Sequence, residues 1–229
     1  MGEPVAVEPV RTVVAAPHRT IDIARILLPG TPRGAVLIAV TADCLRQEST
    51  HLLTAFAEHG YSGIAWEVAR YSDGQTTADD LLDTAITQWL ADADALLDEL
   101  LVDGWRAEET AVVGYAGGAR VSRIIAEHRT LGAAVGVGGH LDRSRRAALT
   151  PWLGMTAGEP TPDPPFQTSV LELAVGYPGV SEQFFRRPRT GADRSAEFES
   201  RQRTIEWLNS RVAPRPTPNA LAWNEHSAS

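Results

Sequence analysis

A glycine-rich turn offers the first candidate for chemistry. Residues Thr110–Ala119 read Thr-Ala-Val-Val-Gly-Tyr-Ala-Gly-Gly-Ala, so an apolar strand runs into the turn Gly114–Gly118 and a helix follows at once. A Gly-x-Ser-x-Gly turn at such a junction presents a nucleophile, because small neighbours leave room around it. Here the glycines and their spacing are kept, but the central residue is Ala116, whose methyl group cannot attack a carbonyl. The alternative interpretation is an ordinary glycine turn.

Few other groups in the chain could supply a nucleophile or a base. The single cysteine, Cys44, is either a displaced nucleophile or a small buried apolar residue. His140 follows the next strand and either reaches a pocket mouth or is a structural loop residue. After it the only histidine is His226, near the chain end, so Ser-His-Asp chemistry lacks a base at the expected place. Tyr115 either donates a hydrogen bond or packs its ring beside the turn.

Apolar runs and helical spacings alternate along the chain. The predicted strands are Val10–Ala15, Ile21–Leu28, Ala35–Val40, Gly63–Ala69, Thr110–Tyr115, Ala133–Val137, Trp152–Ala157 and Ser169–Gly176, the first two being edge strands. The predicted helices are Ser49–His59, Thr77 to about Gly104, Arg120–His128 and Ser195–Val212. The long helix has an outer face that we expect to be solvated, with Asp79, Asp83, Asp92, Asp98 and Glu99. This order predicts an α/β fold with a mostly parallel, doubly wound sheet, in which ligands bind beyond the carboxyl ends of the strands.

Composition restricts the class of protein. The 229 residues suit one domain, at residues 10–212, after a loose lead-in (1–9) and before a Pro-rich tail (213–229) that we expect to be disordered. The net charge is −8 and every cation is an arginine, so nucleic acid is not an expected partner. No signal peptide and no membrane-spanning stretch is evident, which predicts a cytoplasmic protein without a membrane partner. One cysteine excludes the usual zinc clusters, and we expect no metal and no cofactor.

These features occur in an order that resembles the dienelactone hydrolase family of α/β-hydrolases, over about Val10 to Val212. The resemblance implies the α/β-hydrolase fold, a three-layer α/β/α sandwich. The segments that carry it are Ala35–Val40, Glu58-His59-Gly60-Tyr61, the elbow-like Gly114–Gly118, Ala133–Gly139, Gly158-Glu159, Tyr177-Pro178-Gly179 with Phe184-Phe185, and Arg203, Thr204 and Trp207 in the last helix.

Carried over by this resemblance, the family's catalytic positions hold other residues. The nucleophile falls on Ala116 and the histidine falls on Glu182. The aspartate falls near Thr161, although Asp163 lies two residues further on and could replace it. The family's glutamate after the first long strand falls on Thr41. Ester hydrolysis by the family's mechanism is therefore not expected.

The resemblance also implies what is kept. The oxyanion hole is made of backbone N–H groups, here those of Ala42 and Gly117, and needs no nucleophile. Glu182 in an apolar pocket would have a raised pKa suited to proton transfer, whereas the alternative is an exposed loop glutamate. Trp66 either lines the pocket or belongs to the core, and Arg70 could hold a carboxylate or phenolate. The expected substrate-binding residues are Thr41, Ala42, Asp43, Cys44, Trp66, Arg70, Ala116, Gly117 and Asp163.

The sequence thus predicts a non-hydrolytic acid–base catalyst on a hydrolase scaffold. It would be a cyclase, isomerase or lyase for a small carbonyl-bearing or polyketide-like molecule of secondary metabolism, with Glu182, Tyr115 and His140 as catalytic residues. One alternative is a catalytically silent ligand-binding or scaffolding protein. Another is an atypical hydrolase that uses Cys44 or an activated water. The expected partner is a small molecule, and both a monomer and a homodimer are compatible with the sequence.

Overall fold

A computed structural model of the chain describes residues 8–68, 78–138, 146–158 and 171–214, with side chains of the second helix from residue 84 onward. The strands are β1 (Val10–Ala15), β2 (Thr20–Ile26), β3 (Gly34–Val40), β4 (Tyr61–Glu67), β5 (Thr110–Tyr115), β6 (Ala133–Val137), β7 (Trp152–Ala157) and β8 (Glu172–Tyr177). The helices are α1 (Ala42–Ala57), α2 (Ala78–Val102), α3 (Gly117–His128) and α4 (Gly191–Arg211), with a short 3₁₀ turn, η1, at Ala107–Glu109.

The eight strands form one sheet with the order β1-β2-β4-β3-β5-β6-β7-β8. β1 and β2 are antiparallel, as are β2 and β4, and all other neighbours are parallel. From β3 the chain moves to β4 on one side and then returns to β5 on the other side of β3. This reversal places a crevice between the loops that follow β3 and β5, which is where ligands bind in open α/β sheets.

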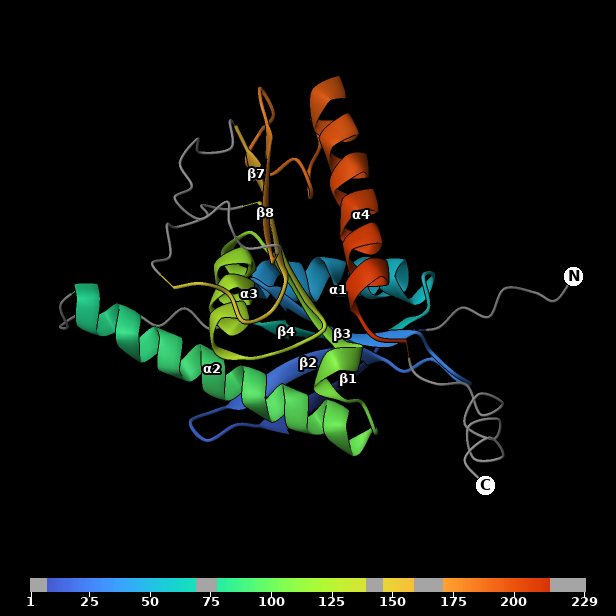
Figure 1. Ribbon diagram of the computed structural model, residues 1–229, viewed down its shortest axis with the longest axis vertical. Coiled ribbons are helices and arrows are strands. Elements are labelled where there is room, and N and C mark those ends of the chain that lie inside the picture. Colours follow the sequence, from blue (N-terminus) through green and yellow to red (C-terminus); the bar gives the residue numbers. More distant parts are fainter. Residues whose placement is uncertain (1–7, 69–77, 139–145, 159–170, 215–229) are drawn as a thin grey trace, which may run out of the picture.

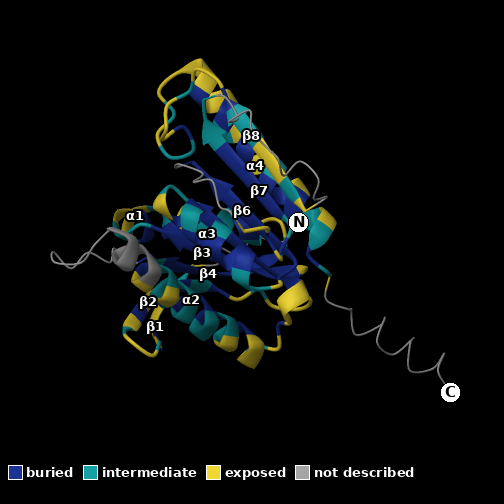
Figure 2. Cartoon of the chain, turned by 60° about the vertical axis from the view of Figure 1, so that its left-hand side comes forward, coloured by how far each residue is buried: buried dark blue, intermediate teal, exposed yellow. Residues whose placement is uncertain are grey.

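Two helical layers cover the sheet. α1 and α4 pack on one face and α2 and α3 on the other, as Figure 1 shows. The central strands between them are buried, and β3 is buried along its whole length (Figure 2). A continuous apolar run such as Ala35–Val40 is stable in this position because both of its faces are covered. The three-layer α/β/α architecture expected from the sequence is confirmed.

Half of the predicted strands have the expected bounds, whereas three helices begin earlier. β1, β5, β6 and β7 have the predicted bounds. α1 begins at Ala42 instead of Ser49, α3 at Gly117 instead of Arg120, and α4 at Gly191 instead of Ser195. The start of α4 is fixed by a capping box in which Asp193 N–H donates to Thr190 Oγ1 and Thr190 N–H donates to the Asp193 carboxylate, both over 3.0 Å. β2 is also not an edge strand, because β1 and β4 flank it.

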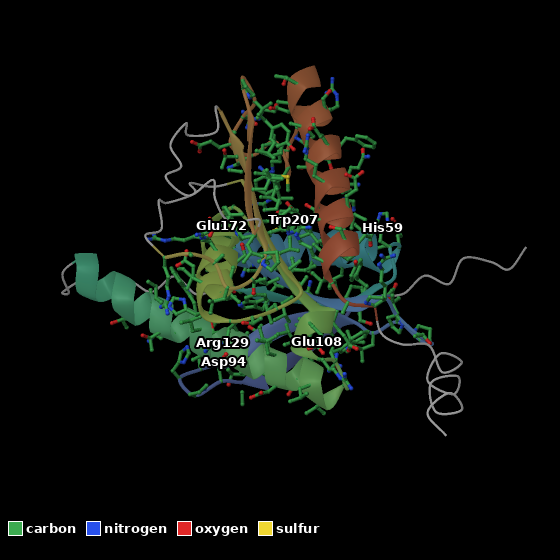
Figure 3. The ribbon with its side chains drawn as sticks, in the orientation of Figure 1. His59, Asp94, Glu108, Arg129, Glu172 and Trp207 are labelled. Carbon is green, nitrogen blue, oxygen red and sulfur yellow. The ribbon has the colours of Figure 1, made fainter. Side chains whose placement is uncertain are left out.

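The expected acidic face of α2 is only partly solvated. Asp98 is exposed, but Asp92 is fully buried, so the prediction is wrong for Asp92. Its carboxylate accepts hydrogen bonds from Arg19 over 2.6 and 3.1 Å and lies 3.2 Å from His18 Nε2. Two residues further along α2, Asp94 points toward Arg129, and the two side chains are joined by 2.6 Å hydrogen bonds (Figure 3). These carboxylates attach α2 to the β1–β2 hairpin and to the end of α3.

Candidate functional site

The turn between β5 and α3 has a strained backbone. Ala116 lies between them with φ 53° and ψ −117°, and it is the only non-glycine residue with positive φ in the described part of the chain. A residue held in this region costs about 1–3 kcal/mol and persists only where its surroundings impose it. A sharp elbow therefore forms here although its central side chain is a methyl group.

Two glycines impose this elbow. A Cβ atom on Gly114 would lie 1.9 Å from the backbone oxygen of Gly118, and one on Gly118 would lie 2.0 Å from the backbone oxygen of Ala39. No side chain fits at these distances, so glycine lets α3 approach β3 and β5 closely. The first turn of α3 is thereby held against the carboxyl end of the sheet.

The first turns of α1 and α3 meet at this edge. β3 and β5 are neighbours, with Ala39 opposite Gly114, so the residues that follow them are close. A Cβ atom on Gly117 would lie 3.6 Å from Cγ2 of Thr41, the N-cap of α1. Neither helix has a side-chain cap, and the first N–H groups of a helix have no partner within it. Two positive helix ends thus face the same crevice, where a negatively charged oxygen is favoured. The assignment of Ala42 and Gly117 as the donors stays a prediction.

The early start of α1 changes the surroundings of Asp43 and Cys44. Both were expected on a loop but lie in the first turn of the helix. Asp43 is exposed and forms an ion pair with Arg46 over 2.7 Å. It therefore does not line the cavity, contrary to the prediction. Cys44 lies on the opposite, inner face and is buried.

Cys44 is the end of a chain of three polar side chains. Its Sγ donates a hydrogen bond to Glu48 Oε2, one turn further along α1, over 3.4 Å. The other oxygen of Glu48 accepts a hydrogen bond from Arg186 Nε, so the two residues form an ion pair. Burial, with a smaller contribution from the charge and hydrogen bond of Glu48, raises the pKa of Cys44 to about 12, which Arg186 opposes in part. The thiol is therefore protonated near neutral pH and is a weak nucleophile.

A cavity of about 400 Å³ lies between α1 and α4. Its walls come from residues 44–56 of α1 and 197–205 of α4, and its inner end is closed by Tyr115, Val137 and Phe185. The Cys44–Glu48–Arg186 chain lies in one wall, and a second ion pair, Glu197–Arg201, lies in the other. The volume is within the range of small-molecule sites.

Tyr115 turns away from the elbow into this cavity. Its ring packs beside Phe185, with the centroids 5.7 Å apart, and its phenol faces Cys44, Glu197 and Arg201. Within the described residues the hydroxyl makes no hydrogen bond. Burial, the largest cause, raises the pKa of Tyr115 well above its ordinary value, so the group is a neutral donor. The ring packs beside the turn, as the sequence allowed, and the hydroxyl stays available.

Glu182 does not stand in an apolar pocket. It is exposed and is not part of the cavity wall, so the position expected for it is wrong. The reason lies in the neighbouring residues, because Ser181 N–H is held by the Asp193 carboxylate over 2.8 Å and Phe184 is fully buried. The turn therefore directs its two phenylalanines inward and leaves residues 181–183 in solvent.

The other predicted residues fall into three groups. Trp66 is fully buried on the α2 and α3 side, because β4 side chains alternate and Ile64 and Trp66 face that core. It thus belongs to the core, which is the alternative that the sequence allowed. Thr41, Ala42, Ala116 and Gly117 are brought together at the crevice, as described above. Arg70, His140 and Asp163, together with Thr161, lie outside the described residues.

The four ion-paired residues of the cavity were missed, namely Glu48, Arg186, Glu197 and Arg201, as were His51, Ser200 and Thr204. The spacing Cys44-x-x-x-Glu48 would have revealed the first, had the helix been extended back to Thr41. Arg186 directly follows Phe184-Phe185, and Glu197 and Arg201 are four residues apart on α4. Among the described side chains, no group of three or more His, Cys, Asp or Glu gathers where a metal ion could bind. No helix of the described residues has the length and apolarity to cross a bilayer.

Comparison with known proteins identifies the fold. No family model and no curated protein matches the sequence. Among solved structures, dienelactone hydrolase from Anabaena variabilis is 16% identical with a TM-score of 0.65, over 90% of this chain and 99% of that one. A dienelactone hydrolase-like promiscuous phosphotriesterase from metagenomic libraries is 15% identical (TM-score 0.59; 91% and 100%). A cold-adapted esterase from an Arctic intertidal metagenomic library is 14% identical (TM-score 0.61; 92% and 97%). The chain therefore has the α/β-hydrolase fold, in the arrangement seen in dienelactone hydrolase-like structures.

Proposed function

We propose that this protein converts a small carbonyl-bearing molecule by acid–base chemistry, without an acyl-enzyme, as a cyclase, isomerase or lyase. The observation that carries the proposal is Ala116, which keeps a strained elbow backbone without a nucleophilic atom. The strain does not serve the alanine side chain, which has no reactive atom. It serves the backbone N–H of Gly117, because the elbow directs the start of α3 toward the crevice.

The proposed reaction uses the crevice to hold an oxyanion. In an isomerisation, a carboxylate takes a proton from the carbon beside the carbonyl, and the electrons move onto the carbonyl oxygen. The N–H groups of Ala42 and Gly117 hold the enolate, and the proton then returns to another carbon, so the composition does not change. No covalent bond to the protein forms in this sequence.

We assign the proton carrier to Glu48 in place of the exposed Glu182. Glu48 lines the cavity and is positioned by both Cys44 and Arg186. Tyr115, kept neutral by burial, supplies a hydrogen-bond donor in the same cavity. His140, outside the described residues, remains a prediction.

The test begins with native mass spectrometry of the protein in a metabolite extract, followed by product analysis of each retained compound. Glu48→Gln should abolish conversion while leaving the unfolding transition cooperative. Glu182→Gln is the matched control and should convert normally. A covalent acyl adduct on the native protein would contradict the proposal, as would unchanged turnover in Glu48→Gln.

A second candidate is a ligand-binding protein without turnover. The observation in its favour is that both carboxylates of the cavity already have an arginine partner, Arg186 for Glu48 and Arg201 for Glu197, so neither stands unpaired toward an occupant. Product analysis separates the two, because a binding protein returns its ligand unchanged. The third possibility, a hydrolase that uses Cys44, is opposed by the protonated state of the thiol. An activated water would need a base in the same crevice, and its product would contain an added water.

A further inference from the structure

The cavity between α1 and α4 has walls that are mainly apolar. The side chains that provide this surface are Leu52, Ala55, Phe56, Val137, Phe185 and Ile205. They come from both helices and from the inner end of the cavity, so an occupant would be enclosed on several sides. Burying an apolar group there is favourable because its surface is removed from water.

The charged groups of the walls already have protein partners. Glu48 is paired with Arg186 and Glu197 with Arg201. The hydroxyls of Ser200 and Thr204 donate to backbone oxygens of α4 over 2.9 and 2.8 Å. An occupant therefore meets no unpaired charge among these groups, and a charged one would lose its hydration without gaining a counter-ion.

Apart from His51, which is exposed, Tyr115 is the polar side chain of the described walls that makes no hydrogen bond to the protein. Its hydroxyl has no hydrogen-bond partner in the described residues, and it lies at the closed end of the cavity. A phenol that is neutral offers one O–H donor. The complementary ligand group is an uncharged acceptor such as a carbonyl oxygen.

We propose that this cavity binds an uncharged, mainly apolar molecule whose carbonyl oxygen accepts a hydrogen bond from Tyr115. The inference rests on the proposed function, since it names the class of substrate. It excludes carboxylates and phosphates as the part of the substrate that enters the cavity. The carbonyl oxygen accepts from Tyr115 in addition to the N–H groups of Ala42 and Gly117, which lie two residues along the chain from the cavity residues Cys44 and Tyr115.

The test uses three probes of equal size: acetophenone, α-methylstyrene, in which CH₂ replaces the carbonyl oxygen, and benzoate. Affinities are measured by ¹H–¹⁵N NMR titration. Acetophenone should bind more tightly than α-methylstyrene, and benzoate should bind most weakly. Tyr115→Phe should weaken acetophenone binding roughly 5- to 10-fold, the equivalent of one hydrogen bond, and leave α-methylstyrene unchanged.

The position of the probes is tested separately. Ala55→Leu adds a side chain to the cavity wall and should weaken both neutral probes at least about tenfold, since it occupies their space. Ala192→Leu makes the same change at an exposed position of α4 and should have no effect. Intermolecular NOEs from acetophenone to the methyl groups of Val137 and Ile205 locate the probe in the unaltered protein, whatever the variants do.

Four outcomes would overturn the inference. They are tighter binding of benzoate than of acetophenone, equal weakening of both neutral probes by Tyr115→Phe, NOEs that place acetophenone elsewhere, and no binding of acetophenone up to its solubility. Turnover is a separate readout. Probe binding in the cavity without conversion of any metabolite would contradict the proposed function alone. Conversion that survives Ala55→Leu unchanged would contradict the cavity inference alone.

Discussion

On the α2 and α3 side of the sheet, buried carboxylates are held by arginines, whereas on the α1 and α4 side the Tyr115 hydroxyl faces a cavity. Asp92 is bound by Arg19, and Glu127 by Arg123 over 2.6 Å. A buried ion pair matters for the stability of the folded state mainly because removal of either partner leaves the other charge buried and uncompensated. An unpaired donor beside a cavity has no such role. The comparison assigns stability to the first side and binding to the second.

The largest effect is expected where α3 packs on β3. Gly118→Ala should prevent cooperative folding, or cost at least about 4 kcal/mol, because its Cβ would lie 2.0 Å from the backbone oxygen of Ala39 and neither backbone can move. Urea unfolding followed by circular dichroism measures the loss. Gly117→Ala is the control: its Cβ would lie 3.6 Å from Thr41, an ordinary contact, so stability should change by less than about 1 kcal/mol. Equal losses in the two variants would refute this packing account.

The next effect concerns the buried charge on α2. Asp92→Ala removes the buried carboxylate that accepts from Arg19 and should lower the free energy of unfolding by about 3 kcal/mol, while probe binding in the cavity stays unchanged. Asp98→Ala, an exposed position of the same helix, should change stability by no more than about 0.5 kcal/mol. If Asp92→Ala lost ligand affinity but not stability, the division between the two sides would be wrong.

A smaller, pH-dependent effect is expected at the segment that closes the cavity. Three backbone N–H groups, of Ser181, Arg189 and Thr190, donate to the Asp193 carboxylate over 2.8 to 3.0 Å and lower its pKa well below the usual range. The unfolded carboxylate titrates near pH 3.9, so between there and the lower folded pKa the unfolded state binds more protons. The stabilisation is thus complete above about pH 4 and is lost as the pH falls further.

Asp193→Asn removes this dependence. The variant should be less stable than the native protein at pH 7, and the difference should narrow as the pH falls below about 4. Urea midpoints at pH 7, 5, 4 and 3 measure it, with the exposed Asp98→Asn as control. A constant difference across this range would mean that the carboxylate charge does not hold the segment.

The strands were predictable because their signal is local. β5, β6 and β7 are continuous apolar runs bounded by turn residues, and their ends could be read directly. The start of α1 could not, because Asp43, Arg46 and Glu48 are polar and the apolar spacing begins only near Leu52. The sequence therefore predicted a loop where the structure has two helical turns.

That error concealed most of the cavity. Cys44 and Glu48 meet only if both are helical, since residues four apart share one face of a helix. The position of Glu182 failed for a different reason. A resemblance assigns a residue to a turn, but the direction of its side chain depends on contacts distant in sequence, here the hold of Asp193 on Ser181.

A substitution beside the thiol of Cys44 is expected to have the smallest effect on stability. It is also the most direct test of the polar groups on the α1 and α4 side. With a pKa of about 12, native Cys44 should react with iodoacetamide at pH 8 at least about tenfold more slowly than the urea-unfolded chain. Glu48→Gln removes the negative charge next to the sulfur, while the positive charge of Arg186 remains nearby. Both effects lower the pKa of the thiol. Alkylation should accelerate, and because the glutamine oxygen can still accept a hydrogen bond from Arg186, the free energy of unfolding should fall by less than the ~3 kcal/mol expected for Asp92→Ala.

Glu197→Gln is the matched control for this experiment. It neutralises a carboxylate on the opposite wall that is paired with Arg201 and makes no hydrogen bond with the thiol, so the alkylation rate should not change. If Glu48→Gln left the rate unchanged, burial alone would govern the thiol. Cys44 would then behave like a buried apolar residue of the α2 and α3 core. Its hydrogen bond to Glu48, and the ion pair of Glu48 with Arg186, would have no effect on the thiol. Acceleration specific to Glu48→Gln would instead mean that the polar groups of the cavity wall tune one another, as a site that moves protons requires.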